Sequence, residues 1–194
     1  MTDLTVVDLD ADDLAWGEHA IAGADQPAGI VMLHADARRG TRSVMVRFPD
    51  GWRRDSTGNQ PAGEEMVLLA GSLTMSGHAC AVGQVLVVAP RATRSATVTG
   101  DGTLAVVWFS GPGGGWADGE ADDAGEVRVL TADAALDRGP VPGLVGNLVG
   151  RDDVAGARFD GDVEVLWLEA RRWAFVPVGS AVPTIPGFAL VHTY

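Results

Sequence analysis

Short apolar runs rich in β-branched residues alternate with turn residues along the whole chain. The runs span residues 29–33, 43–48, 66–70, 85–89, 103–109, 163–168 and 188–191, and most of the 26 Gly and 10 Pro residues lie between them. No run is long enough to cross a membrane as a helix. This pattern predicts an all-β barrel or sandwich. Helical patterning is limited to residues 10–16 and 131–137, where Asp10 and Thr131 could cap one or two turns.

The two short helical pieces also indicate an internal repeat. Residues 9–12 (LDAD) recur as residues 130–133 (LTAD), an offset of 121 positions. Further along, Pro90 corresponds to Pro177, an offset of only 87. The fall in offset means that the second copy would be 34 residues shorter than the first (121 minus 87). The alternative to a repeat is that similar β-strands align by chance. The glycine-rich stretch 111–125 has the composition of a linker. We predict a complete barrel over 1–110, a linker over 111–125 and a reduced second repeat over 126–194.

The amino-acid composition excludes several kinds of catalytic group and binding partner. All 14 residues in the Lys and Arg count are Arg, which excludes a Schiff-base lysine and a phosphate-loop lysine. The formal net charge of −12 disfavours nucleic acid and anionic membranes as partners. The expected partner is therefore a small-molecule ligand or substrate that is neutral or cationic. The lone Cys80 permits no internal disulfide. The acidic start of the chain lacks the basic region and the apolar run of a signal peptide, so we expect a cytoplasmic protein.

One stretch carries a more specific pattern. From Pro61 the chain reads PAGEEMVLLAG, which contains Glu64 and ends at Gly71; a turn follows at 76–78, and GQVLVVAP then ends at Pro90. This stretch resembles the cupin superfamily, most closely the branch related to the cupin domain of ChrR-type anti-sigma factors. The resemblance covers about residues 42–109, and the weaker second copy extends it to the end of the chain.

The resemblance implies an all-β cupin fold, the double-stranded β-helix or jelly-roll barrel. The repeat adds a two-repeat, bicupin-like arrangement with a truncated second repeat. Cupins commonly pair through edge strands, so the resemblance also implies a homodimer, and covering exposed edges gives a physical reason for pairing.

Cupins normally hold a divalent metal with a His-x-His pair, a Glu and a later His, and in this chain that set is degenerate. The pair falls on Gly58 and Gln60, and the later His falls on Arg94 or Ser95, depending on a one-residue gap. Only Glu64 remains as a ligand. A glycine offers no ligand, and an arginine brings a fixed positive charge that repels a cation. We therefore expect neither metal nor cofactor.

If Glu64 faces into the barrel, period-two alternation places Met66 and Leu68 on the same wall. A mostly apolar cavity with one carboxylate is typical of a small-molecule site. Arg94 would pair with Glu64, either as an acid–base or oxyanion-stabilising pair or as an ion pair that only takes the place of the metal. Pairing of Glu64 with Arg47 across the sheet is the alternative.

The predicted catalytic residues are Glu64 and Arg94. The predicted substrate-binding residues are those that the barrel would place around this pair: Gln60, Asn59, Trp52, Met66, Leu68, Arg47 and Trp108. The functional hypothesis is a metal-independent cupin-fold enzyme of specialised metabolism. It would act on an apolar, oxygenated small molecule as a cyclase, isomerase or dehydratase. The alternatives are a non-catalytic cupin that binds a small molecule or a partner, and a metal-dependent cupin dioxygenase.

Overall fold

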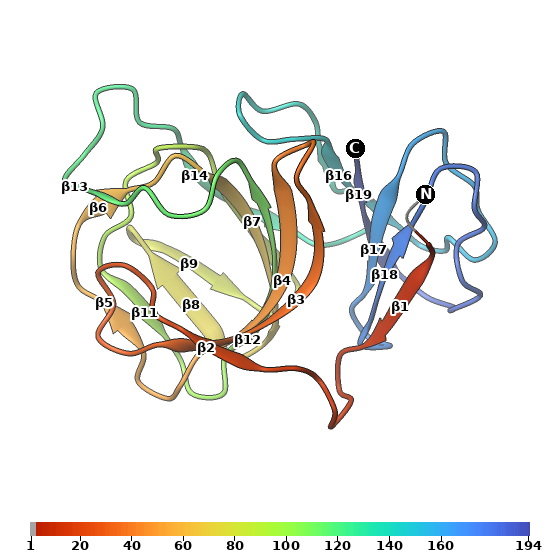
Figure 1. Cartoon of the computed structure of the whole chain (residues 1–194), viewed down its shortest axis with the longest axis horizontal. Helices are drawn as coiled ribbons and strands as arrows, with labels where there is room; N and C mark the ends of the chain where they lie inside the picture. Colours follow the sequence, from red (N-terminus) through yellow and green to blue (C-terminus); the bar gives the residue numbers. More distant parts are fainter. Residues whose placement is uncertain (1–2) are drawn as a thin grey trace. The chain divides into compact units, whose positions relative to one another are not determined.

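The computed structural model describes residues 3–194, and these form antiparallel strands joined by turns, with no helix in that range (Figure 1). The helical pieces expected at 10–16 and 131–137 are therefore wrong. Both segments begin with aspartate-stabilised turns instead: Asp8 Oδ1 accepts a hydrogen bond from Asp10 N at 3.0 Å, and Asp133 Oδ1 accepts one from Ala135 N at 2.9 Å. Such side-chain bonds compete with helical hydrogen bonds. No helix that could span a membrane occurs among the described residues.

All seven strand predictions are confirmed. Each apolar run coincides with a strand whose ends extend by a few residues at most. The strands are β3 (Ala28–Asp36), β4 (Thr41–Arg47), β7 (Gly63–Ala70), β10 (Gln84–Val88), β12 (Leu104–Ser110), β17 (Val163–Trp167) and β19 (Ala189–Thr193).

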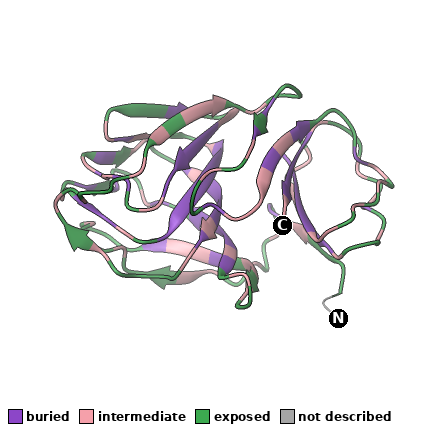
Figure 2. Ribbon diagram, turned by 90° about the horizontal axis from the view of Figure 1, so that it is seen from above, coloured by how far each residue is buried: buried purple, intermediate pink, exposed green. Residues whose placement is uncertain are grey.

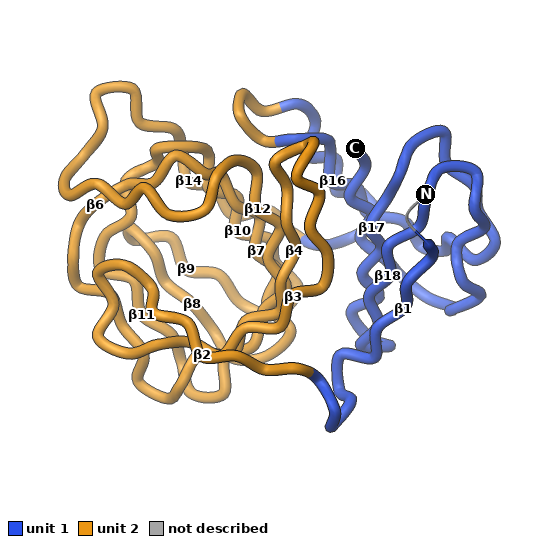
Figure 3. The backbone as a smooth tube through the Cα atoms, viewed as in Figure 1, with its two compact units in different colours: residues 1–14, 132–140, 145–194 blue, residues 15–131, 141–144 orange. Residues whose placement is uncertain are grey.

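The chain folds into two compact units (Figure 3). The larger unit contains residues 15–131 and 141–144. Of the described residues, the smaller unit contains 3–14, 132–140 and 145–194. These boundaries differ from the expected domains because edge strands pair across them. Strand β1 (Thr5–Asp8) pairs with β18 (Arg172–Val176) in the smaller unit, and β14 (Val127–Thr131) pairs with β10 in the larger one.

The larger unit is built on a seven-stranded sheet in the order β14-β10-β7-β12-β4-β3-β2, where β2 is Gly17–His19. A four-stranded sheet has the order β5-β11-β8-β9, with bounds Arg53–Arg54, Thr97–Thr99, Ser72–Met75 and His78–Ala81. Strand β6 (Gly58–Asn59) pairs with β13 (Ala117–Asp118), so the segment expected as a linker is part of this unit.

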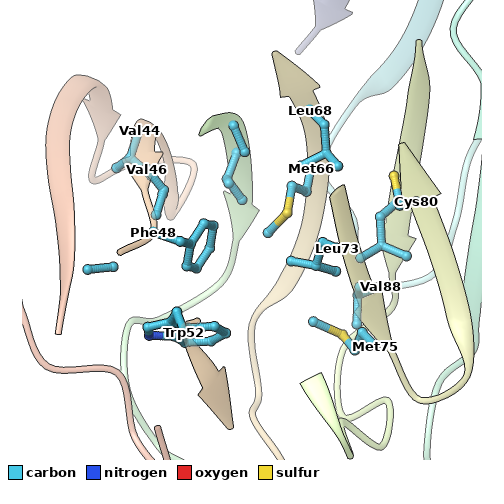
Figure 4. Packing of buried hydrophobic residues seen from close by; sticks show 14 of the residues in the cluster. Val44, Val46, Phe48, Trp52, Met66, Leu68, Leu73, Met75, Cys80 and Val88 are labelled. Atoms are coloured by element: carbon cyan, nitrogen blue, oxygen red, sulfur yellow. The ribbon is translucent and has the colours of Figure 1, made fainter. Parts of the chain in front are cut away.

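The interior of the larger unit lies between its seven-stranded and four-stranded sheets. Alternate residues of β7, among them Met66 and Leu68, pack with Leu73 and Met75 of β8 in one apolar cluster. Figure 4 shows Phe48, Met66 and Leu73 pointing toward one another. In Figure 2 the buried residues follow the central strands and the exposed residues follow the loops. The period-two alternation therefore places one face of β7 in the barrel interior.

The smaller unit has one six-stranded sheet in the order β1-β18-β17-β19-β16-β15, where β16 is Asn147–Arg151 and β15 is Asp137–Arg138. Its apolar cluster includes Val163, Val165 and Trp167, which alternate along β17. The descent of this unit from a second cupin repeat stays a prediction.

Candidate functional site

A cavity of about 130 Å³ lies inside the barrel of the larger unit. A cavity of about 150 Å³ lined by apolar side chains is large enough to hold benzene, so this one suits a ligand of a few heavy atoms. Most of its walls are apolar, and four polar side chains reach it. Its lining residues are Ile21, Ile30, Val46, Phe48, Trp52, Arg54, Gln60, Glu64, Met66, Leu73, Met75, Thr97, Val107 and Phe109.

Glu64 and Arg94 form a buried ion pair beside this cavity. Arg94 Nε lies 3.2 Å from Glu64 Oε1, and the two side chains are 0% and 8% exposed. The Arg94 guanidinium also donates to two backbone oxygens, from Nη1 to Ala92 O at 3.0 Å and from Nη2 to Ala62 O at 3.3 Å. Every nitrogen of this guanidinium thus has a protein acceptor. Arg94 does not itself line the cavity.

The backbone fixes Arg94 in this position. Gly58 and Arg94 form an antiparallel bridge, with Gly58 N donating to Arg94 O at 3.1 Å and Arg94 N donating to Gly58 O at 2.8 Å. A Cβ at position 58 would meet the Trp116 ring at 2.3 Å. It would also meet the backbone oxygen of Ala117 at 2.6 Å, so glycine is required here by the close approach of both residues. The structure brings together Glu64, Arg94 and Gly58, which the sequence pattern had aligned with the metal ligands of cupins.

A second arginine, Arg54, lines the cavity directly. It is 5% exposed, its Nε has no hydrogen-bond partner, and its Nη2 donates to Thr97 Oγ1 at a long 3.4 Å. Its guanidinium carbon lies 4.7 Å from the centre of the Trp116 ring, a cation–π contact. Burial lowers the pKa of Arg54 below its ordinary value, while the charge of Glu64 acts in the opposite direction.

Among the residues predicted to bind substrate, Trp52, Gln60 and Met66 line the cavity. The Trp52 Nε1 donates to Gln26 O at 2.9 Å, and its ring packs at 4.8 Å against the Phe48 ring. Trp52 therefore presents an apolar face to the cavity, with its one donor already paired.

Four of the predicted substrate-binding residues do not line the cavity. Asn59 is turned toward β13, and its Nδ2 donates to Gly119 O at 3.1 Å. Leu68 shares the inner face with Met66 but packs within the apolar cluster. Trp108 lies on the opposite face of β12, because its neighbours Val107 and Phe109 are the ones that reach the cavity.

Arg47, the fourth of these residues, does not pair with Glu64 either. Since Val46 lines the cavity, alternation along β4 turns Arg47 to the outside. There its guanidinium carbon lies 4.2 Å from the centre of the Trp16 ring, in a separate surface groove of about 510 Å³. The alternative pairing of Arg47 with Glu64 is therefore wrong, and Arg47 makes a cation–π contact instead.

Glu65 also departs from the simple alternation argument. The alternation predicts that Glu65 faces outward as a charge that is either solvated or directed at a dimer partner, yet Glu65 is 1% exposed within the single chain. It is paired in register with Trp108 on the face of the sheet that points away from the cavity. Both faces of β7 are therefore covered.

Sequence reasoning missed Arg54 and Thr97. Arg54 lies in the two-residue strand β5, within a polar stretch that carries no strand pattern. The available signal was period-two alternation. Trp52 marks the buried face, so Arg54, two residues later, lies on the same face, and Arg53 between them is exposed.

No protein-family model matches the chain, and no curated protein matches it. Several solved structures have a fold similar to that of this chain. A proposed dioxygenase from Nostoc punctiforme superimposes with a TM-score of 0.71 at 11% identity, covering 98% of this chain and 82% of that one. A proposed glyoxylate-induced protein from Pseudomonas aeruginosa gives a TM-score of 0.60 at 12% identity, covering 98% and 88%. The protein Ylba from E. coli gives 0.50 at 11% identity, covering 98% and 86%.

These superpositions, together with the sheet order, define an all-β protein with the cupin fold. The expected fold is thereby confirmed, and the narrower assignment to the ChrR-type branch stays a prediction. The predicted metal-independent cyclase, isomerase or dehydratase is corrected by the same comparison. The activity named for a similar structure is that of a dioxygenase, which favours the metal-dependent alternative over this hypothesis.

The residues present do not fit the metal that the cupin fold commonly holds. The Glu64 carboxylate is bound by the Arg94 guanidinium at 3.2 Å, and Gly58 offers no ligand. No group of three His, Cys, Asp or Glu side chains suited to a metal ion occurs within residues 3–194. The polar side chains that do reach the cavity, Arg54 and Gln60 among them, are suited to hydrogen bonding with an organic ligand.

Proposed function

We propose that the barrel cavity of the larger unit binds a small organic molecule. The observation that carries this proposal is the cavity itself: about 130 Å³ inside the barrel, with apolar walls and a few convergent polar side chains. Ligand sites are commonly built in this way, with apolar walls for affinity and a few polar groups for orientation. Trp52, Phe48 and Met66 supply the apolar surface, and Arg54 and Gln60 supply the polar groups.

A cavity-filling variant tests this proposal. Val107 lines the cavity and is 1% exposed, whereas Val98 of the neighbouring sheet is 43% exposed and serves as the matched control. We expect a panel of neutral and charged fragments of up to about nine heavy atoms to include binders that raise the melting temperature of the wild type and of Val98→Phe. The same fragments should not stabilise Val107→Phe.

A second filling variant guards against misfolding. Leu73 lies on β8, in the other sheet, so Leu73→Phe fills the cavity from the opposite wall. Circular dichroism identifies which variants keep the wild-type strand content. If no fragment binds the wild type, or if binding survives in a folded filling variant, the cavity is not a ligand site.

Dioxygenase activity is a second candidate, favoured by the activity named for the Nostoc punctiforme structure over 98% of this chain. Elemental analysis of protein purified without chelator, combined with oxygen uptake, tests it. Stoichiometric iron, zinc, manganese or nickel would support this candidate and overturn the interpretation of Gly58 and Gln60. Substoichiometric metal and no oxygen uptake in the presence of a cavity ligand would count against it.

A further inference from the structure

The cavity wall carries more positive than negative charge. Two guanidinium groups, those of Arg54 and Arg94, and one carboxylate, that of Glu64, are buried in or beside it. The two arginines are close enough for each charge to act on the other, since Arg94 further lowers the pKa of Arg54. One carboxylate thus stands against two buried cations.

Glu64 does not satisfy both arginines. Its Oε1 is engaged by Arg94 Nε at 3.2 Å, and the remaining nitrogens of Arg94 are held by backbone oxygens. Arg54 is left with a single long hydrogen bond, to Thr97, and with an Nε that has no partner. All three guanidinium nitrogens of Arg94 are therefore engaged, whereas Arg54 keeps unused donors.

The aromatic contact does not replace the missing acceptor. The Trp116 ring stabilises the Arg54 charge through its π face at 4.7 Å. The N–H groups in the plane of the guanidinium still need hydrogen-bond acceptors, and a buried donor without one is destabilising, more so when it is charged. An arginine presents these donors as a planar fork that matches the two oxygens of a carboxylate.

We propose, building on the proposed ligand-binding function, that the cavity takes a small organic monocarboxylate whose carboxylate group binds Arg54. The apolar remainder of the ligand packs against Phe48, Met66 and Val107. The cavity volume of about 130 Å³ limits this remainder to a short aliphatic chain or a single ring. Gln60 is placed to donate or accept a further hydrogen bond.

Calorimetric titration with matched pairs of probes tests the proposal. Butanoate and benzoate are the anions, and butanamide and benzamide are their neutral counterparts of the same shape. The proteins are the wild type, Arg54→Gln and the control Arg53→Gln; the exposed Arg53 pairs with Asp55 at 2.6 Å outside the cavity. The wild type and Arg53→Gln should bind at least one anion about tenfold to a hundredfold more tightly than its amide, as expected for charge-assisted hydrogen bonds. Arg54→Gln should lose this preference.

The outcomes separate this proposal from the one on which it rests. If amides bind as tightly as carboxylates to the wild type, the cavity binds ligands but the anion proposal is overturned, whether or not Arg54→Gln folds. If the preference persists in folded Arg54→Gln, Arg54 is not the anchor and the proposal also fails. If sulfate or chloride displaces benzoate at equal concentration, the site takes inorganic anions instead. If no probe binds the wild type, both proposals fail.

Discussion

The two buried arginines of the larger unit have different environments and therefore different roles. Arg94 is enclosed by acceptors of its own chain, the Glu64 carboxylate and two backbone oxygens. Arg54 faces the cavity with donors to spare. Changes at Glu64 should consequently be felt first in stability, and changes at Arg54 first in ligand selectivity.

Glu64→Gln is expected to lower the free energy of unfolding by about 3–5 kcal/mol, because it leaves the Arg94 charge buried without a counter-charge. Urea denaturation measures this change. Glu120, which is exposed, provides the control: Glu120→Gln should alter the free energy of unfolding by no more than about 0.5 kcal/mol.

The double variant Glu64→Gln/Arg94→Met should be more stable than Glu64→Gln alone, since it removes the unpaired charge and keeps an apolar side chain in its place. Additive losses from the two single substitutions would show that the two side chains do not interact, contrary to the observed geometry.

A pH-dependent change in stability is expected from Cys80. Burial raises the pKa of its thiol from 9.0 to about 11. The folded chain therefore retains a proton between pH 9 and pH 11 that the unfolded chain releases, so the stabilising contribution present below pH 9 is lost as the pH rises to 11. The chain has no Lys and a single Tyr, so few other groups titrate in this window.

Urea titrations at intervals from pH 8 to pH 11 should thus show a decline in wild-type stability that is shallower in Cys80→Ala. Identical slopes in the two proteins would contradict the assignment. Reaction of the native thiol with a disulfide reagent at pH 8 should also be slow, because the thiolate is the reactive form.

Part of the site was predictable because it depends on local alternation. Glu64 and Met66 lie on the same strand, and the period of two places both on the barrel wall. The proximity of Arg94 to Glu64 was indicated by the resemblance to cupins. Arg54 was missed because its alternation with Trp52 is short and lies in a polar stretch, and its contact with the distant Trp116 carries no local pattern.

The strands show a similar division. The five-residue strands β14, β16 and β18 lie outside the predicted apolar runs and were missed. Strands with a longer apolar run, such as β7 and β12, were predictable from sequence. The two-residue strands β5, β6 and β13 were not, since each forms by pairing with a distant partner and carries no pattern of its own. These short strands shape the end of the barrel where Arg54 and Gly58 lie.

The turn between β7 and β8 offers a test of backbone and packing effects. Gly71 has a φ of +73°, and a Cβ at this position would meet Thr103 Oγ1 at 2.4 Å and Thr103 Cα at 2.6 Å. Gly77 in the next turn has a φ of +79° but nothing within 4 Å of its Cβ position. Gly77→Ala therefore isolates the cost of the backbone conformation, about 1–2 kcal/mol.

Gly71→Ala should cost more than Gly77→Ala, by roughly 1–3 kcal/mol, because the overpacked Thr103 must also move. Denaturant midpoints of the two variants give the comparison. Equal losses would show that Thr103 adapts without cost.

Each of the two units gathers segments that are distant in the chain. The smaller one combines β1 with strands from the second half of the sequence, and the larger one includes residues 141–144. Apolar patterning does not reveal such exchanges, since it identifies strands but not their partners. The two-repeat ancestry and the homodimer stay predictions, the latter testable by sedimentation at several protein concentrations.

The excess of acidic residues should make stability depend on salt. With a net charge of −12, the folded chain carries self-repulsion that added salt screens. We expect the melting temperature at pH 7 to rise as sodium chloride is increased from about 10 mM to about 300 mM. Over this range the Debye length falls from about 30 Å to under 10 Å. A fall in melting temperature over this range would mean that attractive ion pairs outweigh the repulsion.

The contact between Gly58 and Trp116 constrains the order in which mutations can be tolerated. Any side chain at position 58, including histidine, would collide with the Trp116 ring, whose face also supports Arg54. Replacing Trp116 alone would not make room, because a Cβ at position 58 would also meet the backbone oxygen of Ala117 at 2.6 Å. An evolutionary path from this site toward a histidine-rich one must therefore move the backbone of β13 as well as change Trp116, and the change at Trp116 removes the support of Arg54. Directed evolution that begins at position 58 would meet a loss of folding before any gain of a ligand.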